Sequence, residues 1–456
     1  MEQFDVIVVG SGSGMLVASA AVEQGMKVAL VEHGRMGGTC INVGCVPSKM
    51  LIYPADVLAT IKEAEKLGIK ASINKVDFNN IMTRMHTLVN HDTKQQAAAV
   101  EATPKMHWFK DRGEFIADYT MKVGKHTIKA KKIFVATGTR TLIPPIKGLQ
   151  NVEYLTSDTV LELKTQPKSI IIVGGGYIGM EYGHFFSALG TKTTIVHREN
   201  RVIPEEEPEV SELLQKEITK HLELFTEYEA IEVKQEGPLK TLIARNLRDN
   251  TERHFTAEAL MIAAGRRSNS DELKPEKSGI EVDKKGFIVV NEYLETKKKN
   301  IYAFGDAIGI QMFRHAANYE AGIVWHNANH EHKVPMDFSA TPHAVFTHPQ
   351  IASVGFKEQE AKNKYEIAVG IAEYKDTAMG AAMGYPEGFV KVIVERETGK
   401  ILGAHIVGPE ASGLIQEITN AMVTGKGDFS PIARGMHIHP ALNEVVQNAF
   451  GSLHPV

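Results

Sequence analysis

The sequence predicts an α/β protein with two units of the strand, glycine turn, helix, strand kind, followed by a C-terminal α+β module. Three observations predict this fold. A glycine-rich turn follows the first apolar strand, over residues 10–14, and a second such turn follows an apolar strand at residue 174. From about residue 338 the pattern changes to mixed strands and helices, with a hairpin expected over residues 390–408.

Length and composition limit the classes of protein that remain. The chain has 456 residues, of which 43% are apolar and 23% charged, and its formal charge is −4. This length is enough for about three domains. A charge this close to neutrality, with no long basic run, does not favour a nucleic-acid or membrane partner. The first apolar run, Phe4 to Val9, is too short for a signal peptide or a membrane span, so we expect a cytoplasmic protein.

The first unit runs from Phe4 to Glu32 and has the form of a Rossmann-like nucleotide-binding domain. Gly10 and Gly12 allow a tight turn and the close approach of a pyrophosphate to a helix N-terminus. Glu32, twenty-two residues after Gly10, can bond a ribose hydroxyl. Met15 stands where a third glycine is usual, so we expect looser packing there or compensation by Gly14.

The second unit, SIIIVGGGYIGMEYGHFFSALGTKTTIVHREN, repeats this form with all three glycines present, at Gly174, Gly176 and Gly179. Its second strand ends not in an acid but in His197, followed by Arg198 and Arg201. Cations at this place suit a 2′-phosphate and favour NADPH over NADH. The alternative is that these arginines simply lie on a solvated surface.

The only two cysteines, Cys40 and Cys45, lie five positions apart. On a regular helix their Cα atoms would lie about 8–9 Å apart, which exceeds the distance that a disulfide bridges. A bond between them therefore requires an irregular backbone, which Asn42 and Gly44 tolerate. Such a strained bond belongs to the labile, catalytic class. A zinc site is the alternative, but its usual second pair of ligands is missing nearby, and we expect no metal site.

Two further patterns mark the ends of the nucleotide-binding units. A strand and turn over residues 133–145 should close the first, and the segment from Gly265 to Asn269 should close the second. In NIYAFGDA a strand runs into Gly305 and Asp306, where the acid could bind a sugar or ribityl hydroxyl. Asp306 could equally cap a following helix.

Several of these motifs together resemble the pyridine nucleotide-disulfide oxidoreductases. The segment GGTCINVGCVPSK, residues 37–49, is similar to the redox-active disulfide motif of that family, and the two glycine turns, ATG at residues 136–138, the Gly305–Asp306 pair and HIHPALNE follow in the family's order. The resemblance implies an FAD-binding domain (1–147), an NAD(P)-binding domain (148–270), a central domain completing the FAD site (271–337), and an α+β dimerisation domain (338–456) that forms a homodimer.

The resemblance also implies which residues bind the cofactors. For FAD they are Gly10, Gly12, Gly14, Glu32, Gly38, Thr39, Ala136, Thr137, Gly138, Gly305 and Asp306. For NADPH or NADH they are Gly174, Gly176, Tyr177, Gly179, Arg198, Arg201 and Gly265. Tyr177 occupies the place of an aromatic gate over the nicotinamide pocket, or it simply packs.

The catalytic residues follow in the same way. The resemblance assigns Cys45 to the sulfur nearer the flavin and Cys40 to interchange with the substrate. It pairs Lys49, beside the flavin, with Glu181 of the second glycine-turn helix. It makes His439 the acid–base group, held in the right tautomer by Glu444.

Within this family the chain is most similar to the dihydrolipoamide dehydrogenases and the mycothione reductases. We expect an FAD-dependent oxidoreductase that passes electrons between NAD(P)H and a disulfide, with dihydrolipoamide dehydrogenase as the first interpretation. Reduction of a small disulfide, as in mycothione reductase, reduction of a metal ion, as in mercuric reductase, and docking to a lipoyl-bearing multienzyme complex are the alternatives. The expected partners are a second copy of the chain and a small-molecule or lipoyl disulfide.

Overall fold

The computed structural model describes residues 1–456 and contains two compact units, each assembled from three separate segments. Unit 1 comprises Met1–Met50, Asn80–Leu142 and Gly265–Phe338. Unit 2 comprises Leu51–Asn79, Ile143–Ala264 and Ser339–Val456. The chain passes between the units within α3 (Cys45–Glu63) and near the start of α4 (Phe78–Glu101). Neither these nor any other helix is both long and apolar enough to cross a membrane. The fourfold domain division stays a prediction.

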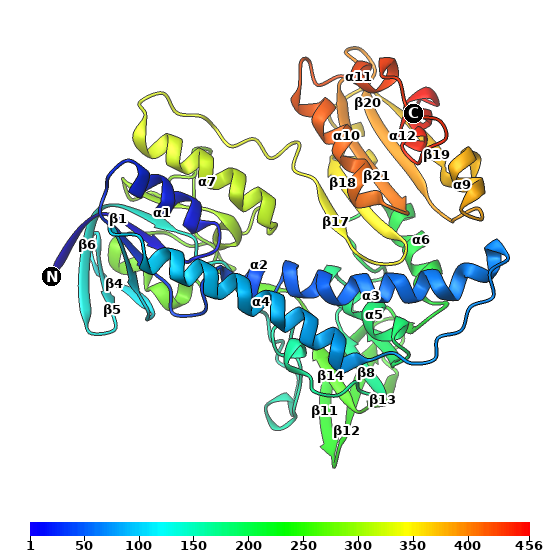
Figure 1. Ribbon diagram of the computed structural model, residues 1–456, viewed down its shortest axis with the longest axis horizontal. Coiled ribbons are helices and arrows are strands. Elements are labelled where there is room, and N and C mark those ends of the chain that lie inside the picture. Colours follow the sequence, from blue (N-terminus) through cyan, green and yellow to red (C-terminus); the bar gives the residue numbers. More distant parts are fainter. The chain divides into compact units, whose positions relative to one another are not determined.

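Unit 1 is built on a seven-stranded sheet in which β1 lies between β2 and β6. Figure 1 labels β1, β4, β5 and β6 of this sheet. β1 pairs in parallel with β2 and β6, and β3 and β16 extend the parallel part at either side. β5 is the antiparallel neighbour of β6, and β4 in turn pairs antiparallel with β5. The strands are β1 (Glu2–Val9), β2 (Val28–Val31), β3 (Met106–Phe109), β4 (Gly113–Ala117), β5 (Thr120–Val123), β6 (His126–Val135) and β16 (Ile301–Ala303).

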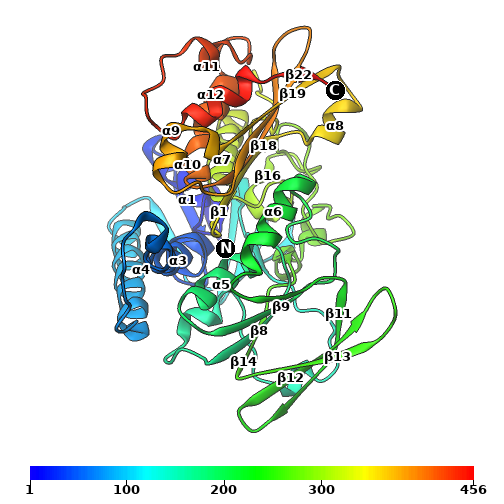
Figure 2. The ribbon, with the colours of Figure 1, turned by 90° about the vertical axis from the view of Figure 1, so that its right-hand side faces the viewer.

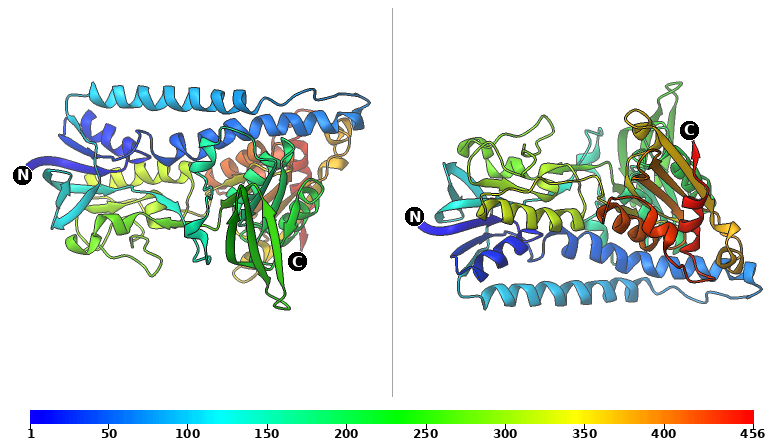
Figure 3. Two further views of the ribbon diagram at one scale, coloured as in Figure 1. Left: turned by 90° about the horizontal axis from the view of Figure 1, so that it is seen from below. Right: turned by 90° about the horizontal axis from the view of Figure 1, so that it is seen from above.

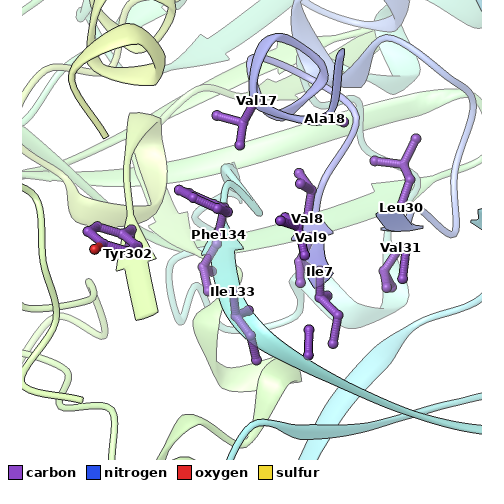
Figure 4. Close-up of a cluster of buried hydrophobic side chains, with 14 of the residues drawn as sticks. Ile7, Val8, Val9, Val17, Ala18, Leu30, Val31, Ile133, Phe134 and Tyr302 are labelled. Atoms are coloured by element: carbon purple, nitrogen blue, oxygen red, sulfur yellow. The ribbon is translucent and has the colours of Figure 1, made fainter. Parts of the chain in front are cut away.

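The core of unit 1 forms because these strands are apolar on both faces, as parallel strands covered on both sides must be. Val6, Ile7 and Val8 of β1 are fully buried. Figure 4 shows side chains of β1, β2 and β6 gathered beneath the α1 residues Val17 and Ala18. The ring of Tyr302 stacks on Phe134 with 5.2 Å between centroids, so the strand at residues 301–303, far along the chain, completes this core.

The two glycine turns start their helices differently. α5 (Tyr177–Ala188) begins three residues after Gly174, whereas α1 (Gly14–Glu23) begins four residues after Gly10. A Cβ on Gly179 would lie only 1.9 Å from the carbonyl oxygen of Gly174. Met15, the equivalent residue of the first turn, cannot take that position, and Gly14 instead provides the close approach to β1, where its Cβ would meet the Val8 side chain at 2.9 Å. The expected compensation by Gly14 is confirmed.

The remaining elements of unit 1 are short apart from α7, which packs beside α1. A two-stranded antiparallel ladder joins residues 139–141 to residues 266–268. These elements are α2 (Gly38–Asn42), β7 (Thr139–Thr141), β15 (Arg266–Ser268), α7 (Arg314–Asn329) and the 3-10 helices Ser270–Leu273, Pro275–Ser278 and Gly305–Ile308.

Unit 2 contains the second glycine-turn unit as a four-stranded parallel sheet in the order β10-β9-β8-β14, beside a three-stranded antiparallel sheet, β11-β12-β13 (Figure 2). The elements are β8 (Ser169–Val173), β9 (Lys192–Val196), α6 (Pro208–Ile218), β10 (Glu223–Phe225), β11 (Tyr228–Glu236), β12 (Leu239–Asn246), β13 (Glu252–Ala257), β14 (Ala259–Ile262) and the 3-10 helices Ala64–Leu67, Leu149–Asn151 and Thr159–Glu162. The parallel strands again read as continuous apolar runs.

The C-terminal part of unit 2 is the predicted α+β module. Its six strands form an antiparallel sheet, and the helices drawn in orange to red lie against it (Figures 1 and 3). Ile415, Ile418, Val445 and Val446 of these helices share one core with the strands. The predicted hairpin is confirmed as β20 and β21. The elements are β17 (His343–Val345), β18 (Gln350–Gly355), α8 (Glu358–Lys362), β19 (Ile367–Glu373), the 3-10 helix Tyr374–Asp376, α9 (Ala378–Ala382), β20 (Phe389–Glu395), β21 (Ile401–Gly408), α10 (Ala411–Val423), α11 (Ser430–Arg434), α12 (Glu444–Gly451) and β22 (His454–Pro455).

Candidate functional site

The first glycine turn is a cradle made of backbone alone. Gly10 has a φ of +104°, and a Cβ there would lie 2.2 Å from the carbonyl oxygen of Ala136. A Cβ on Gly38 would lie 2.7 Å from the Cα of Gly12. Three segments distant in sequence therefore meet at this turn without side chains between them, which is the arrangement that lets backbone N–H groups approach a phosphate.

Glu32, the residue after β2, holds the turn together. Its Oε2 accepts hydrogen bonds from the N–H and the hydroxyl of Ser11 at 3.0 and 2.9 Å, and its Oε1 accepts one from the N–H of Gly34 at 2.7 Å. An ionised carboxylate has about four acceptor sites, and three are used here. One remains for a hydroxyl group, as the sequence predicts for a ribose.

Asp306 lies inside a 3-10 helix that follows β16, and Phe304 is that helix's N-cap. The capping interpretation of Asp306 is therefore wrong. Its carboxylate accepts a hydrogen bond from the hydroxyl of Thr139 at 2.8 Å, and burial raises its pKa. The side chain is thus a half-buried acceptor that follows a strand end, which leaves the ligand-binding interpretation.

Glu320 of α7 is a buried carboxyl next to this strand end that the sequence analysis missed. It accepts the N–H of Gly305, and burial, with a contribution from Asp306, raises its pKa to about 7. Its Oε1 and the hydroxyl of Thr137 are buried and have no hydrogen-bond partner. No local pattern marks Glu320, because its role depends on α7 packing beside the 3-10 helix Gly305–Ile308.

These residues fit FAD, the cofactor that the resemblance implies. The cradle at Gly10 and Gly38 admits no side chain, the carboxylates of Glu32 and Asp306 accept hydroxyl donors, and the hydroxyl of Thr137 lacks a protein partner. A dinucleotide supplies phosphate acceptors and ribose or ribityl donors for such groups. The proposed roles of Thr39 and Gly138 in binding FAD stay predictions.

The two cysteines stand on either side of a helix break. Cys40 lies in α2, Cys45 is the first residue of α3, and residues 43–44 separate the helices. The side-chain amide of Asn42 donates to the carbonyls of Met36 and Gly38 at 3.0 and 2.9 Å, which ties the last residue of α2 to the start of that helix. The predicted irregular backbone is confirmed. The two residues are present as thiols, Cys40 half-buried and Cys45 exposed.

The pKa of Cys40 is raised, first by its hydrogen bond with Cys45 and then by burial. The guanidinium of Arg314 acts in the opposite direction and lowers it. Arg314 is the first residue of α7, and one of its Nη atoms lies 3.5 Å from the position of a Cβ on Gly12. This half-buried cation therefore faces both the dithiol and the glycine turn. The sequence analysis missed it because only the packing of α7 beside α1 brings it there.

Lys49 and Glu181 fall in different units. Lys49 lies in α3 within unit 1, and Glu181 lies in α5 within unit 2. Glu181 is 8% exposed and accepts the N–H of Phe346 at 3.1 Å. The pairing of Lys49 with Glu181 stays a prediction.

The second glycine turn repeats the close approach of the first. Gly174 has a φ of +120°, and a Cβ there would lie 2.2 Å from the carbonyl oxygen of Ala263. Tyr177 begins α5, and Gly176 is its N-cap. Gly265, which we predicted to close this region, lies in unit 1, where its carbonyl accepts the N–H of Leu142 at 3.0 Å.

His197 is part of this turn rather than a free cation. Its Nδ1 accepts the N–H of Gly175 and its Nε2 donates to the carbonyl of Arg201, both at 3.0 Å, and burial lowers its pKa. Arg198 is exposed and lies 3.7 Å from Glu229, whereas the Nε of Arg201 is buried without a partner. Arg198 and Arg201 are therefore the cations that follow β9 near the second glycine turn.

His439 and Glu444 are paired as the sequence predicts. The Nδ1 of His439 lies 2.8 Å from Glu444, whose other oxygen accepts the N–H of Ala441 at 3.0 Å. The hydrogen bond from His439 is the main cause of the lowered pKa of Glu444. The ring of His439 is 72% exposed, while that of neighbouring His437 is 5% exposed and pairs with Glu417. His439 is therefore the histidine available to a partner.

Comparison with known proteins gives family matches to almost the whole chain. The family described as pyridine nucleotide-disulphide oxidoreductase matches residues 4–321, and its dimerisation domain matches residues 341–450. Mycothione reductase of Mycobacterium tuberculosis is 36% identical over 98% of this chain and 99% of its own length.

Two other relatives are named for different activities. Dihydrolipoyl dehydrogenase of Geobacillus stearothermophilus is 34% identical over 98% of this chain and 95% of its own length. Mercuric reductase of Staphylococcus aureus is 34% identical over 92% of this chain and 77% of its own. The solved structure of the HOCl-induced flavoprotein disulfide reductase of Escherichia coli has a TM-score of 0.87, 26% identity, and covers 98% of this chain and 99% of that one.

The position of Arg314 leads to a testable prediction. Replacing Arg314 with Met removes a cation that favours the thiolate, so the pKa of Cys40 should rise by about one unit. The pH midpoint of alkylation of Cys40 by iodoacetamide in the reduced protein, followed by peptide mass, measures this shift. Arg314→Lys keeps the charge and should stay near the wild-type midpoint. Equal midpoints in the Met variant and the wild type would contradict the assignment.

Proposed function

Since this chain belongs to the pyridine nucleotide-disulphide oxidoreductase family, we propose that it passes electrons between NAD(P)H and a substrate disulfide through Cys40 and Cys45. The observation that carries the proposal is the hydrogen bond between these two thiols across the break between α2 and α3. Two sulfurs in hydrogen-bonding contact are placed to form and break a disulfide with each other.

The residues that would hold FAD are the glycine turn over residues 10–14, Glu32, Asp306 and Thr137. Bound FAD supplies two-electron transfer between the nicotinamide and sulfur. The chain contributes the placement of these groups and the exclusion of side chains from the turn.

The sulfur chemistry can be written with the residues of the chain. The Cys40 thiolate attacks one sulfur of the substrate disulfide, and the substrate's other sulfur leaves as a thiolate. The Cys45 thiolate then attacks Cys40 in this mixed disulfide and releases the second substrate thiol. The products are two substrate thiols and a Cys40–Cys45 disulfide, and dihydrolipoamide oxidation is the same sequence reversed. Arg314 favours the thiolate form of Cys40 that the first step needs.

His439 supplies and accepts the protons of these steps. Its Nδ1 is held by Glu444, which leaves Nε2 to protonate the departing thiolate. We propose a homodimer in which His439 serves the dithiol of the partner subunit, in accord with the exposure of its ring and with the match to a dimerisation domain. A cytoplasmic location, where thiols are kept reduced, suits this chemistry.

We propose dihydrolipoamide and lipoamide as the first substrate pair, by similarity to the dihydrolipoyl dehydrogenases. A second candidate is the reduction of a small disulfide, which the similarity to mycothione reductase over nearly the full length of both chains favours. Mercuric reductases are longer than this chain and match it over part of their length.

We propose NADPH as the preferred nicotinamide donor. The residue that follows β9 is His197 rather than an acid. Both ring nitrogens of His197 are used inside the turn. Arg198 and Arg201 remain as cations for a 2′-phosphate.

The substrate assay tests the proposed function. The purified yellow protein is assayed with NADPH and NADH against lipoamide, mycothione disulfide, glutathione disulfide, coenzyme A disulfide and mercuric ion. Turnover of at least one disulfide is expected, with lipoamide first, and Cys40→Ser should lower it about a thousandfold or more because the exchange needs a thiolate. The same variant should keep its reduction of a quinone acceptor. If every disulfide is inert with both donors, the proposed function is wrong.

A second prediction concerns Glu444. Changing it to Gln removes the charge that orients and polarises His439, so disulfide turnover should fall about 10- to 100-fold while quinone reduction stays unchanged. Glu417→Gln is the matched control, because the His437–Glu417 pair has the same 2.8 Å separation but a buried ring. The steady-state rates of the two variants make the comparison. Equal losses in both would mean that the Glu444 pair has no special role.

A third prediction tests the donor preference. Arg198→Ala should raise the KM for NADPH about tenfold, since a charged contact to a phosphate is lost, and should change the KM for NADH by less than about twofold. Arg245→Ala, which removes another exposed arginine of unit 2, is the control. If Arg198→Ala changes the two KM values equally, the preference does not depend on this cation.

A further inference from the structure

A buried carboxylate that the proposed chemistry does not use lies beside Tyr177. Glu206, between β9 and α6, is 2% exposed. It accepts hydrogen bonds from the hydroxyl of Tyr177 at 3.1 Å, from the Nε2 of His343 at 2.6 Å and from the hydroxyl of Ser353 at 2.5 Å. All of these residues belong to unit 2. Glu206 is therefore the common acceptor of three side chains from three elements, α5, β17 and β18.

Glu206 is ionised at neutral pH although it is buried. Burial alone would raise its pKa, but the hydrogen bonds of His343 and Ser353 outweigh burial and hold the pKa at about 2. His405 extends the network, because its Nδ1 lies 3.1 Å from the Ser353 hydroxyl. The adjacent Glu207, also 2% exposed, is separately paired with the buried Lys391. The charge of Glu206 is thus met by hydrogen bonds from uncharged or titratable groups and by no lysine or arginine.

This carboxylate fixes one orientation of Tyr177. Burial and the nearby charge of Glu206 raise the pKa of the Tyr177 phenol, so the phenol stays protonated and donates. The ring also stacks on His343, with 5.7 Å between centroids and 17° between planes. The hydroxyl and the ring face of Tyr177 are therefore both held by groups that are connected to Glu206.

Tyr177 begins α5 at the glycine turn where the nucleotide is expected, whereas His343 and Ser353 lie in the part of the chain that matches the dimerisation domain. We propose that Glu206 is a positioning residue for Tyr177: it ties the aromatic side chain at the nicotinamide-binding turn to strands β17 and β18. This inference rests on the proposed function, because it gives the tether a role in nicotinamide binding. A ring already held in one orientation loses less conformational freedom when the ligand packs against it.

The test is a double-mutant cycle on the purified flavoprotein. Glu206→Gln keeps the shape of the side chain and removes its charge, and Tyr177→Phe removes the hydroxyl alone. Glu206→Gln makes the hydrogen bond to Tyr177 neutral and Tyr177→Phe abolishes it, so either single variant should bind NADP⁺ about fivefold more weakly. The double variant should be no weaker than the single variants, because both remove the same tether. Isothermal titration calorimetry measures the dissociation constants of both ligands.

Two controls separate positioning from general damage. Glu205→Gln removes an exposed neighbouring charge that makes no hydrogen bond to Tyr177 and should leave NADP⁺ affinity within about 1.5-fold of the wild type. Adenosine 2′,5′-diphosphate, which lacks the nicotinamide half, should bind all variants equally. A merely structural role of Glu206 would instead weaken both ligands and lower kcat together with affinity.

The outcomes distinguish this inference from the proposed function. If the wild-type protein is not reduced by NADPH or NADH, the proposed function fails. If it is reduced, but the losses in Glu206→Gln and Tyr177→Phe add, or the adenosine diphosphate is weakened as much as NADP⁺, the tether is overturned and the proposed function stands. Equal, non-additive losses confined to the nicotinamide dinucleotide support the tether.

Discussion

The structure depends first on a break in a helix that lets two sulfur atoms meet. A continuous helix would carry Cys40 and Cys45 apart, and the turn between α2 and α3 brings them into hydrogen-bonding contact instead. The Asn42 amide ties the end of α2 to its start, and Gly44 leaves room for the turn, because a Cβ there would lie 3.0 Å from the carbonyl oxygen of Thr39. The contact between the two thiols therefore depends on the geometry of the backbone between them. The glycine turn, the acidic strand ends and α7 are arranged around it in the same unit.

Burial raises the pKa of both Glu320 and Glu206, and the hydrogen bonds that each carboxyl group accepts decide whether its pKa lies above or below the ordinary value. Glu320 receives one backbone N–H, has an orphaned oxygen, and has a pKa raised to about 7. Glu206 receives three side-chain donors and has a pKa of about 2 at similar burial. The first can be neutral at physiological pH and stands beside the dinucleotide turn, whereas the second is a fixed charge. The two groups illustrate how hydrogen bonding to the charged form outweighs desolvation.

The sequence predicted those features that depend on local pattern. Each of these features involves residues that are close together in the sequence. They are the glycine turns, the apolar runs of the parallel strands, the hairpin of β20 and β21, the helix break and the His439–Glu444 pair. Arg314, Glu320 and Glu206 could not be found in this way, because packing of distant elements gives them their partners. The interleaving of the two units has the same cause: strand β16 and helix α7 return to the first sheet after the whole second glycine-turn unit. The capping interpretation of Asp306 could be excluded only from the bounds of its 3-10 helix, whose N-cap is Phe304.

The central claim, that a sulfur couple works together with a bound flavin, is tested most directly by anaerobic reductive titration of the purified protein with dithionite. The account predicts that each protomer consumes enough reductant for both the flavin and the Cys40–Cys45 disulfide, with a long-wavelength absorbance band at the midpoint. Consumption of only enough reductant for the flavin, with no such band, would contradict it.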